Sequence, residues 1–515
     1  MKLYKLLHIT QTSITVELNN KLIYFNDKPY DVYLNDKKVL KDVKTNVFSL
    51  YNLDPDTNYR LRIDEVEKKF TTKEETCLLN VKDFFAIGDG KKDDTQAIQL
   101  AIDSCLPGGR VYIPAGTYLV KPLFLRSNVT IELAKDALIL GSKNQSDYPV
   151  LPPVINVNDG TRFELSSWEG ESLPTHASVF TGINVENVSI IGEGVINCSG
   201  FEGGWWENPK EIKGNGFRPK GIYLTNSKDI LLQGITVKNT PSWNIHPFFC
   251  ENIKVLDIKL ESPKDSPNTD GCNPEFCTNV EIIGVNFSVG DDCIALKSGK
   301  IELGARYKKA TENVTIRNCY MAFGHGAVVL GSEISGGIKN ISVTQCYFES
   351  TDRGLRIKTR RGRGKDSIID EILFENIYMN NVLAPLTVNM FYFCDWDGKT
   401  EYVWSKEPLK LDERTPYIGR FKFKDIVCDN VHSAAGYFYG LPEQTIKKIE
   451  LENVVFNYAK DPQPFVPAMM SFLEPMAGHG LVFNNVDEVI LRNVEVNVTD
   501  KPEIEKDNVG SLIAE

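Results

Sequence analysis

Residues 252–285 read NIKVLDIKLESPKDSPNTDGCNPEFCTNVEIIGV, and this stretch decides the fold because it opens and closes on the same short phrase. The phrase is an asparagine or another polar residue followed by two apolar residues that flank a polar one. Copies of this type begin at Asn128, Asn187, Asp229, Asn252, Asn279, Asn313 and Asn340, and later ones at Asp370, Lys448 and Glu488. The steps between the copies at 252, 279, 313 and 340 are 27, 34 and 27 residues. A period within roughly 20–50 residues is typical of a solenoid.

Each repeat carries two or three short strand patterns and almost no helical periodicity. The sequence therefore predicts an all-β chain whose main part is a parallel β-helix. An array of ordinary β-sandwiches would need antiparallel hairpins with two-residue turns, and few such turns are present.

Residues 84–118 predict how this solenoid starts. A helix is expected from about Asp93 to Thr95 onward, where the aspartates suit its positive end. Its apolar face consists of Ala97, Ile98, Ala101 and Ile102. The segment resembles the entry cap of right-handed parallel β-helix proteins of the pectin-degrading kind, and the hydrophobic end of a solenoid needs such a cover.

The first 75 or so residues have a different pattern, with short alternating strands separated by turn formers. Residues 53–59, LDPDTNY, resemble the L-x-P-x-T-x-Y corner of fibronectin type III modules, in which the tyrosine hydroxyl ties a loop back to a strand. We therefore predict a fibronectin type III-like β-sandwich at residues 1–76 and the β-helix at residues 77–515. The small domain carries no evident catalytic group, so it is predicted to be a packing or spacer module.

Composition and charge exclude several classes of protein. Hydrophobic residues make up 42% and charged residues 25% of the chain, as in ordinary globular proteins. The 58 basic and 69 acidic residues give a net charge of −11, which argues against nucleic-acid binding. No apolar run approaches the roughly 18 residues that a membrane-spanning helix requires.

The N-terminal residues have only a short LLHI patch and no signal-peptide core. The 11 cysteines include no CxxC pair and no metal-like spacing. Both features favour free thiols in a reducing compartment. We therefore expect a cytoplasmic protein, or a secreted or periplasmic one if a signal peptide has been removed.

Four further phrases occur one per repeat, and each carries polar groups suited to chemistry. They are Asn268-Thr269-Asp270, Gly290-Asp291-Asp292, Gly324-His325-Gly326 and Arg356-Ile357-Lys358. Counted from position 270, the steps to positions 291, 325 and 356 are 21, 34 and 31 residues, about one coil each. Neighbouring coils stack about 4.8 Å apart, so the phrases would form one surface row. Any one phrase alone is typical of a solvated turn or strand, but four in order indicate a site.

With all four phrases intact, the chain resembles the polygalacturonases of glycoside hydrolase family 28 over about residues 80–500. The resemblance implies hydrolysis of α-1,4-galacturonosidic bonds in polygalacturonate or oligogalacturonides with inversion, and it requires no cofactor and no metal. Asp291 would be the general acid, and Asp270 and Asp292 would hold and activate the attacking water. His325 would sustain the protonation of the acid.

The resemblance also implies a substrate-binding set. Arg356 and Lys358 would bind the substrate carboxylate, with Asn268 and Tyr392 completing the site. Residues 353–365 hold seven basic residues and no acidic one, and arginine forks match carboxylates well. Aromatic residues that could stack on nucleic-acid bases are absent from this run, so a uronate substrate fits it better.

Other substrate contacts are predicted outside the four phrases. Asn244 and His246 precede the first phrase by one repeat, and Lys297 follows Asp292 by five residues. Trp205-Trp206 and Trp243 suit either sugar platforms or packing.

The chemistry of glycoside hydrolysis agrees with this assignment, because it needs one protonated and one ionised carboxyl group. An inverting enzyme usually separates them by roughly 6.5–9.5 Å, and residues on neighbouring coils are expected to give that separation. Successive strand residues point to opposite faces, so Asp291 and Asp292 can share a face only at a turn or bulge. Gly290 makes such a turn possible.

Long insertions at 138–182, 199–220 and 389–417 predict walls around the groove. Walls across one end would give exo-action from the non-reducing end and release galacturonate. The alternatives are an endo-polygalacturonase or a rhamnogalacturonan or xylogalacturonan hydrolase. A calcium-dependent pectate lyase and a non-catalytic carbohydrate-binding β-helix are further alternatives.

Overall fold

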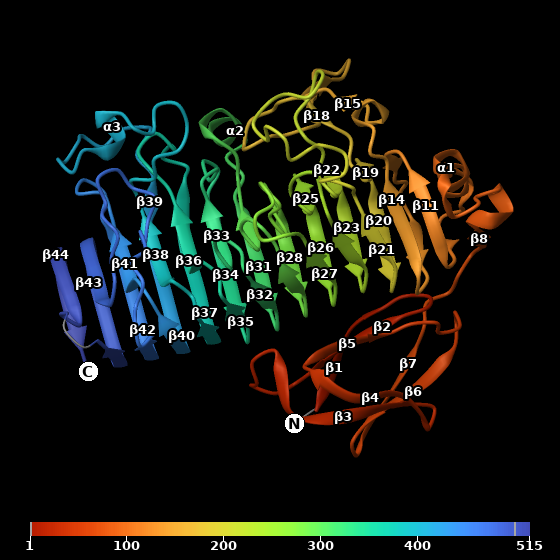
Figure 1. The fold of residues 1–515 in the computed structure, drawn as a ribbon, viewed down its shortest axis with the longest axis horizontal. Coiled ribbons are helices and arrows are strands. Elements are labelled where there is room, and N and C mark those ends of the chain that lie inside the picture. The colour runs from red at the N-terminus through yellow and green to blue at the C-terminus, as the bar shows by residue number, and fades with distance from the viewer. Residues whose placement is uncertain (1–2, 499–500) are drawn as a thin grey trace.

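A computed structural model describes residues 3–498 and 501–515, and its main part is the predicted parallel β-helix (Figure 1). The strands stack coil upon coil in parallel register, in three ladders that form three faces of the solenoid. The few helices lie outside the ladders: η1 (Val81–Phe84), α1 (Thr95–Ser104), η2 (Gln145–Asp147), α2 (Ile301–Tyr307) and α3 (Glu401–Trp404).

The first ladder contains the recurring phrase and runs the length of the solenoid. Its strands are β8 (Leu78–Asn80), β10 (Gly109–Ile113), β13 (Val129–Leu133), β20 (Glu186–Gly192), β23 (Lys228–Gln233), β26 (Glu251–Leu256), β28 (Thr278–Ile283), β31 (Thr311–Arg317), β34 (Ile338–Thr344), β37 (Ile368–Asn380), β40 (Arg420–Val431), β42 (Ile446–Tyr458), β43 (His479–Asn497) and β44 (Ile504–Ala514). From β37 onward these strands are long enough to bend into the second face.

Before β37, the second ladder is made of separate strands. It consists of β9 (Asp89–Asp93), β11 (Gly116–Val120), β14 (Ala137–Gly141), β21 (Val195–Asn197), β24 (Thr236–Lys238), β27 (Lys259–Glu261), β29 (Asn286–Ser288), β32 (Tyr320–Ala322) and β35 (Tyr347–Glu349).

The third ladder carries the predicted site. It consists of β12 (Leu123–Phe124), β19 (Phe180–Ile183), β22 (Ile222–Thr225), β25 (Ile245–Phe248), β30 (Ile294–Leu296), β33 (Val328–Gly331), β36 (Arg353–Lys358), β38 (Ala384–Asn389), β41 (Ala434–Tyr439) and the start of β43. Between β25 and β30, residues 272–275 continue it through isolated bridges. The insertions add β15 (Val150–Leu151) with β18 (Thr175–His176), β16 (Val154–Asn156) with β17 (Arg162–Glu164), and β39 (Tyr417–Ile418).

The recurring asparagine has a structural cause. Asn252, Asn279, Asn313 and Asn340 all have a positive φ between 54° and 59° at the bend that opens each coil. Asparagine tolerates this left-handed conformation better than most residues. Their side chains also form a ladder, since the amide nitrogens of Asn279, Asn313 and Asn340 each donate to the asparagine oxygen of the preceding coil at 2.7–3.2 Å. The repeat in the sequence therefore marks the corner of the solenoid.

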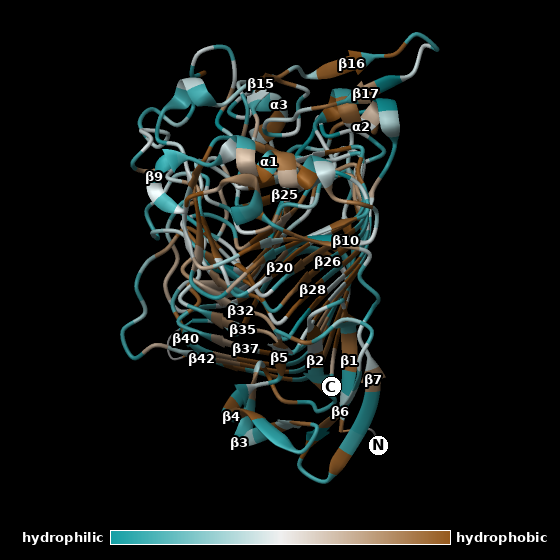
Figure 2. Ribbon diagram, turned by 90° about the vertical axis from the view of Figure 1, so that its right-hand side faces the viewer, coloured by the Kyte–Doolittle hydropathy of each residue, from teal (hydrophilic) through white to brown (hydrophobic). Residues whose placement is uncertain are grey.

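The solenoid start has the predicted cap. Helix α1 buries Ile98, Ala101 and Ile102 against the first coils, and Figure 2 looks along the solenoid from this end. The side chain of Asp94 accepts hydrogen bonds from the backbone of Ile87 and Gly88 rather than capping the helix.

The N-terminal residues form two antiparallel sheets. One contains β1 (Tyr4–Ile9), β2 (Ile14–Leu18) and β5 (Val47–Leu50), and the other contains β3 (Phe25–Leu34), β4 (Lys37–Thr45), β6 (Asn58–Ile63) and β7 (Val66–Thr71). At the predicted corner the backbone N–H of Asp54 donates to the hydroxyl of Tyr59 at 2.8 Å. The assignment to the fibronectin type III class stays a prediction.

This N-terminal unit packs along the flank of the solenoid (Figure 1). Glu17 is buried and forms a bidentate ion pair with Arg317 at 2.6 and 3.0 Å, and Asn318 donates to it at 2.7 Å. Val47 packs with Leu231 and other outward-facing apolar residues of the coils. The contact is therefore both apolar and charged.

Two predictions about composition can be compared with the structure. All 11 cysteines lie within the described ranges, and none forms a disulfide. Among the described residues, none of the helices combines the length and apolar character needed to cross a membrane.

Candidate active site

The four predicted phrases meet at one edge of the third ladder, where its strands begin. The register pairs Ile245 with Cys272, Ile294 and Val328 on successive coils. The first three phrases directly precede residues 272–275, β30 and β33, while the fourth lies on β36. The structure therefore brings the predicted carboxylates, imidazole and cations into one surface region.

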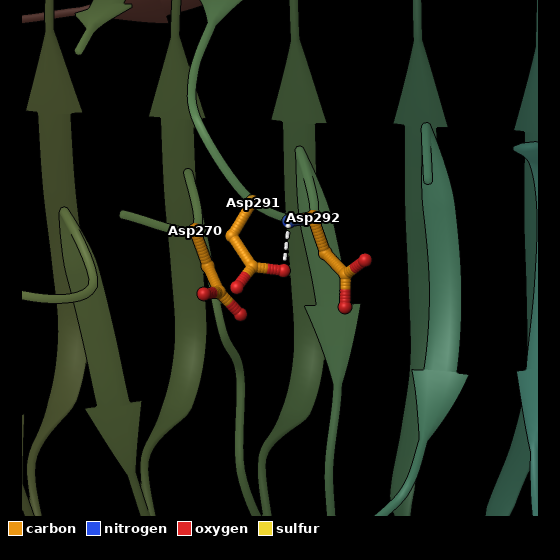
Figure 3. A group of neighbouring side chains, drawn as sticks. All are labelled: Asp270, Asp291 and Asp292. Carbon is orange, nitrogen blue, oxygen red and sulfur yellow. Dashed lines mark hydrogen bonds between the residues drawn. The ribbon is translucent and has the colours of Figure 1, made fainter. Parts of the chain in front are cut away.

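Three carboxylates form the centre of this region (Figure 3). Asp270, Asp291 and Asp292 each offer an oxygen atom within 4.8 Å of the others. The carboxylates of Asp270 and Asp291 lie together, and that of Asp292 turns toward the following coils. The expected separation of roughly 6.5–9.5 Å is therefore wrong for this site, because neighbouring coils place these residues closer than a pair flanking a sugar ring.

The predicted turn at Gly290 is present. Residues 289–293 lie outside the strands, so Asp291 and Asp292 escape the alternation of a strand. A Cβ at Gly290 would lie 2.5 Å from the backbone oxygen of Ser266 and 2.6 Å from that of Pro263. Glycine is needed here because of close backbone approach.

Asp292 is held as an ionised carboxylate. Its Oδ1 accepts from Arg356 Nη1 at 3.1 Å, and its Oδ2 accepts from Lys358 Nζ at 2.6 Å. Burial opposes ionisation, but the Lys358 ammonium and the Arg356 guanidinium outweigh it and lower the pKa of Asp292 to about 2. The two cations predicted to bind substrate thus also neutralise a site carboxylate.

Asp270 and Asp291, in contrast, have raised pKa values that favour the protonated form. Burial and the charge of Asp291 raise the pKa of Asp270, and burial and the charge of Asp292 raise the pKa of Asp291. Asn273 donates to Asp270 at 2.8 Å, and Asp291 accepts from the backbone N–H of Asp292 at 2.9 Å. Crowded carboxylates of this kind share a proton.

His325 lies at the open side of the site, with 53% of its side chain exposed. Its Nδ1 pairs with Asp352 at 2.8 Å, and this hydrogen bond raises the pKa of His325. A protonated His325 lowers the pKa of Asp291, because a positive charge favours the ionised carboxylate. The charge of His325 thus favours the ionised form of Asp291, and the expected role of His325 in keeping the acid protonated stays a prediction.

Asn244 and His246 do not reach the substrate face. Both side chains are fully buried. The amide of Asn244 donates to the backbone oxygens of Thr269 and Asp270 at 3.1 and 3.0 Å, and His246 pairs with Glu275 at 3.0 Å. Direct substrate contact, as predicted for Asn244 and His246, is therefore not supported, because both act from beneath the site.

Lys297 is part of a buried network beside the carboxylates. Its ammonium donates to Glu333 at 2.8 Å and lies 4.8 Å from the ring centre of Trp243. This pairing lowers the pKa of Glu333, whereas burial, followed by the charge of Glu333, raises the pKa of Glu275 to about 7. Lys297 is close enough to influence the charges of Asp270 and Asp292.

Insertion residues pack on the N-terminal side of the three carboxylates. Trp243 shares its register position with Asp270 and Asp292 on successive coils. Trp168, from the 138–182 insertion, stacks on Trp243 with ring centres 6.1 Å apart and on Phe217 at 5.1 Å. Both tryptophans are buried, and Trp243 lies about one coil, or 4.8 Å, before Asp270.

Arg218 belongs to the same wall. It is fully buried, and its guanidinium donates to the Asn268 side chain at 2.6 Å and to the backbone oxygens of Pro241 and Pro267 at 2.8 and 2.9 Å. Asn268 thus anchors the wall next to Asp270. Of the sugar platforms considered, Trp205 is also buried, and it packs against Tyr148 and His176.

A loop at 459–478 covers the other side. Arg353 donates to the backbone oxygens of Val466 and Pro467 at 2.7 Å each, and Met469 Sδ lies 3.0 Å from Arg356. Tyr392 bridges to this loop, and Lys358 lies 5.9 Å from its ring centre. Tyr392 therefore lies beside the predicted cations, as expected.

Several residues of the site were missed from the sequence. Asp352 lies four residues before Arg356 and could have been found by asking what faces His325. Arg218 and Trp168 lie in insertions without coil register, so no sequence signal places them. The 459–478 loop is likewise outside the repeat.

Comparisons with known proteins agree with this geometry. Residues 129–405 match the model of glycosyl hydrolases family 28, and residues 78–133 match a rhamnogalacturonase A/epimerase, pectate lyase-like model. A probable polygalacturonase of Vitis vinifera is 32% identical over 385 residues, covering 73% of this chain and 74% of that protein. A polygalacturonase of Cryptomeria japonica is 26% identical, and the match spans 66% of this chain but 62% of that protein.

Solved structures share the fold. The family 28 exopolygalacturonase of Yersinia enterocolitica has a TM-score of 0.76 at 20% identity, covering 100% of this chain and 99% of that one. The exopolygalacturonase of Thermotoga maritima has a TM-score of 0.62 at 22% identity, covering 85% and 91%. The match of the family model over more than half of the chain, together with the Vitis vinifera relative, shows that this chain belongs to family 28 of the glycosyl hydrolases.

Proposed function

We propose that the protein hydrolyses α-1,4-galacturonosidic bonds of polygalacturonate or oligogalacturonides. One observation carries the proposal: Asp291 and Asp292 lie side by side with pKa values pushed apart, one raised and one lowered. Such a divided pair supplies the acid and the ionised group that glycoside hydrolysis needs. The Vitis vinifera relative is named a probable polygalacturonase, and Arg356 and Lys358 supply positive charge at the site. Both observations favour a carboxylated sugar as substrate.

In the proposed reaction, Asp291 donates its proton to the glycosidic oxygen as the bond to the anomeric carbon breaks. A water held by Asp270 and Asp292 attacks that carbon and gives its proton to Asp270. The shared proton makes this assignment consistent, because Asp270 is ionised and basic when the proton resides on Asp291. His325, open to solvent, is placed to return a proton to Asp291 for the next turnover.

Inversion is proposed for a physical reason. The short carboxylate distances alone would suit a retaining enzyme. However, both oxygens of Asp292 are bound by Arg356 and Lys358, which makes Asp292 a poor nucleophile toward carbon. Proton NMR of the first-formed product tests this: inversion requires the β-anomer from the α-linked substrate, and the α-anomer would contradict it.

Exo-action is proposed because insertion residues around Trp168 cover one end of the site. The wall around Trp168 lies before Asp270, and the 459–478 loop lies over Arg356. A polymer can then enter only with its end, so we expect galacturonate without a rapid loss of viscosity. A rapid viscosity loss would support an endo-polygalacturonase instead.

The remaining alternatives have their own readouts. A calcium-dependent lyase would lose activity with a chelator and form an unsaturated product that absorbs ultraviolet light. A carbohydrate-binding β-helix without catalysis would keep its function in Asp291→Asn. Activity on rhamnogalacturonan or xylogalacturonan in preference to polygalacturonate would show that the enzyme has a different substrate within the same family.

A further inference from the structure

A cavity lies where the strands of the third ladder end, whereas the predicted catalytic phrases lie mainly where these strands begin. Its volume is about 800 Å³. It is lined by helix α2, by the 138–182 and 389–417 insertions and by the turn after β36. These segments lie along the upper edge of the solenoid in Figure 1. We refer to this cavity as the ridge basin.

The ridge basin is rich in positive charge although the chain has a net charge of −11. Its lining has six cationic and four acidic side chains. The cations are Arg162, Lys300, Arg306, Arg360, Arg363 and Arg414. A local excess of cations in an acidic protein attracts anionic ligands.

The floor of the basin is built by ion pairs. Asp395 accepts from Lys300 at 3.0 Å, from Arg363 at 3.0 Å and from Arg360 at 3.3 Å. Lys300 also pairs with Glu171 of the other insertion at 2.8 Å. The two insertions are therefore tied together through Lys300, which gives the basin a fixed shape.

Two guanidinium groups at the basin remain available. Arg306 is exposed on α2 and forms no hydrogen bond or ion pair within the described part of the chain, and Glu302, one turn earlier, does not pair with it. Arg414 lies 3.7 Å from Asp412 and stacks on the ring of Tyr402 at 4.4 Å. Both can bind a carboxylate without breaking a buried pair.

An exposed aromatic ring completes the set. Trp396 lines the basin and is 95% exposed. A tryptophan face and exposed guanidinium groups in one cavity suit a pyranose ring that carries a carboxylate. A neutral sugar would stack on the tryptophan ring but form no ion pair with the guanidinium groups.

The basin also adjoins the catalytic site. Arg363 lines the basin and lowers the pKa of Glu333, which holds Lys297 beside the carboxylates. Residues 292 and 300 are eight positions apart, so the basin lies at most about 26 Å from Asp292 along an extended chain. An acidic chain of several sugars is long enough to span even that largest distance.

We propose that the ridge basin is a second binding site for the acidic sugar chain whose end occupies the catalytic groove. The proposal rests on the proposed function, since it assigns the basin to the same substrate class. It gives long substrates an additional contact and leaves short ones unaffected.

The test uses the full chain in an Asp291→Asn background, so that ligands are not cleaved. Calorimetric titration compares heptagalacturonate with trigalacturonate, before and after Arg306→Ala combined with Arg414→Ala. We expect the Kd of heptagalacturonate to rise roughly three- to tenfold, as for loss of two partly exposed ion pairs, and that of trigalacturonate to stay unchanged. Arg492→Ala, which changes a partly exposed arginine on β43 far from the basin in the sequence, is the control.

Several outcomes would overturn the proposal: an unchanged Kd for heptagalacturonate, an equal weakening for both ligands, or equal binding of maltoheptaose. Trp396→Ala gives a second, independent variant, for which a weaker binding of heptagalacturonate alone is again expected. If the wild type cleaves no galacturonide, the proposed function fails, yet the titration still decides whether the basin binds an acidic chain.

Discussion

At the scale of single residues, the site depends on how one proton is divided among three carboxylates. Asp292 is kept ionised by Arg356 and Lys358, while Asp270 and Asp291 are both biased toward protonation. The identity of each aspartate is visible in the sequence, but its charge state is not. That state depends on Arg356 and Lys358, which lie on a coil more than 60 residues later in the sequence.

Asp291→Asn tests the role of the acid. We expect kcat to fall by about 10²–10⁴-fold, the usual contribution of general acid catalysis. The melting temperature should stay the same or rise, because the change removes a carboxylate crowded against Asp292. Activity assays and thermal melts check both parts, and a variant with half of the wild-type kcat would exclude Asp291 as the acid.

Asp352→Asn tests the pairing of His325. The hydrogen bond from Asp352 raises the pKa of His325, so its loss should lower that pKa toward the ordinary value of about 6.5. Since a raised folded-state pKa stabilises the protonated form, this stabilisation is present at low pH and lost as pH rises through the folded pKa. NMR titration of the imidazole measures the shift, and Asp352→Glu should restore part of it.

At the scale of elements, the repeats could be predicted because the corner of a coil is often marked by an asparagine, which the sequence shows directly. The asparagine phrase marks a positive φ and an amide ladder, so the ladder positions and the four catalytic phrases followed from spacing. The walls could not be predicted in the same way. Trp168, Arg218 and Met469 come from segments outside the coil register, and their positions depend on tertiary packing.

Burial also limited the prediction of substrate contacts. Asn244 and His246 lie on the coil before Asp270, but both side chains are fully buried and bind the protein itself. Spacing along the sequence locates a residue on a coil without saying what lies above it. The same limit applies to the close approach of the three aspartates, which follows from the turn at Gly290.

The wall before Asp270 has a testable consequence. Trp168→Ala removes a ring that stacks on Trp243 and Phe217, so the groove should lengthen and digalacturonate should appear beside galacturonate. Loss of a buried tryptophan also costs about 3–5 kcal/mol of stability, so melts must accompany product analysis. Trp168→Phe keeps a stacked ring and should keep galacturonate as the product; an unchanged product in both variants would exclude this wall.

At the scale of the whole molecule, the N-terminal sheets and the solenoid share buried charges. Glu17 pairs with Arg317 and accepts from Asn318. These contacts lower the pKa of Glu17 against the effect of burial. Glu17 therefore stabilises the protein at neutral pH, and this contribution is lost as the pH falls below the ordinary carboxyl pKa of about 4.3.

Glu17→Ala should lower the free energy of unfolding by about 3–5 kcal/mol, because it leaves Arg317 partly buried without its partner. Calorimetry should show a lower melting temperature for the solenoid as well as for the N-terminal sheets. Asp31→Ala, which removes an exposed pair with Lys38, is the control and should change little. Two independent transitions, with that of the solenoid unaffected, would contradict a coupled molecule.

The proposed exo-action on galacturonides rests on one covered end of the site and on a divided carboxylate pair. A chromatographic time course on polygalacturonate and trigalacturonate, with Asp291→Asn as the inactive control, tests it most directly. We predict galacturonate as the product from the earliest time point with both substrates. A ladder of intermediate oligomers from polygalacturonate would contradict the account, because it would mean that the groove is open at both ends.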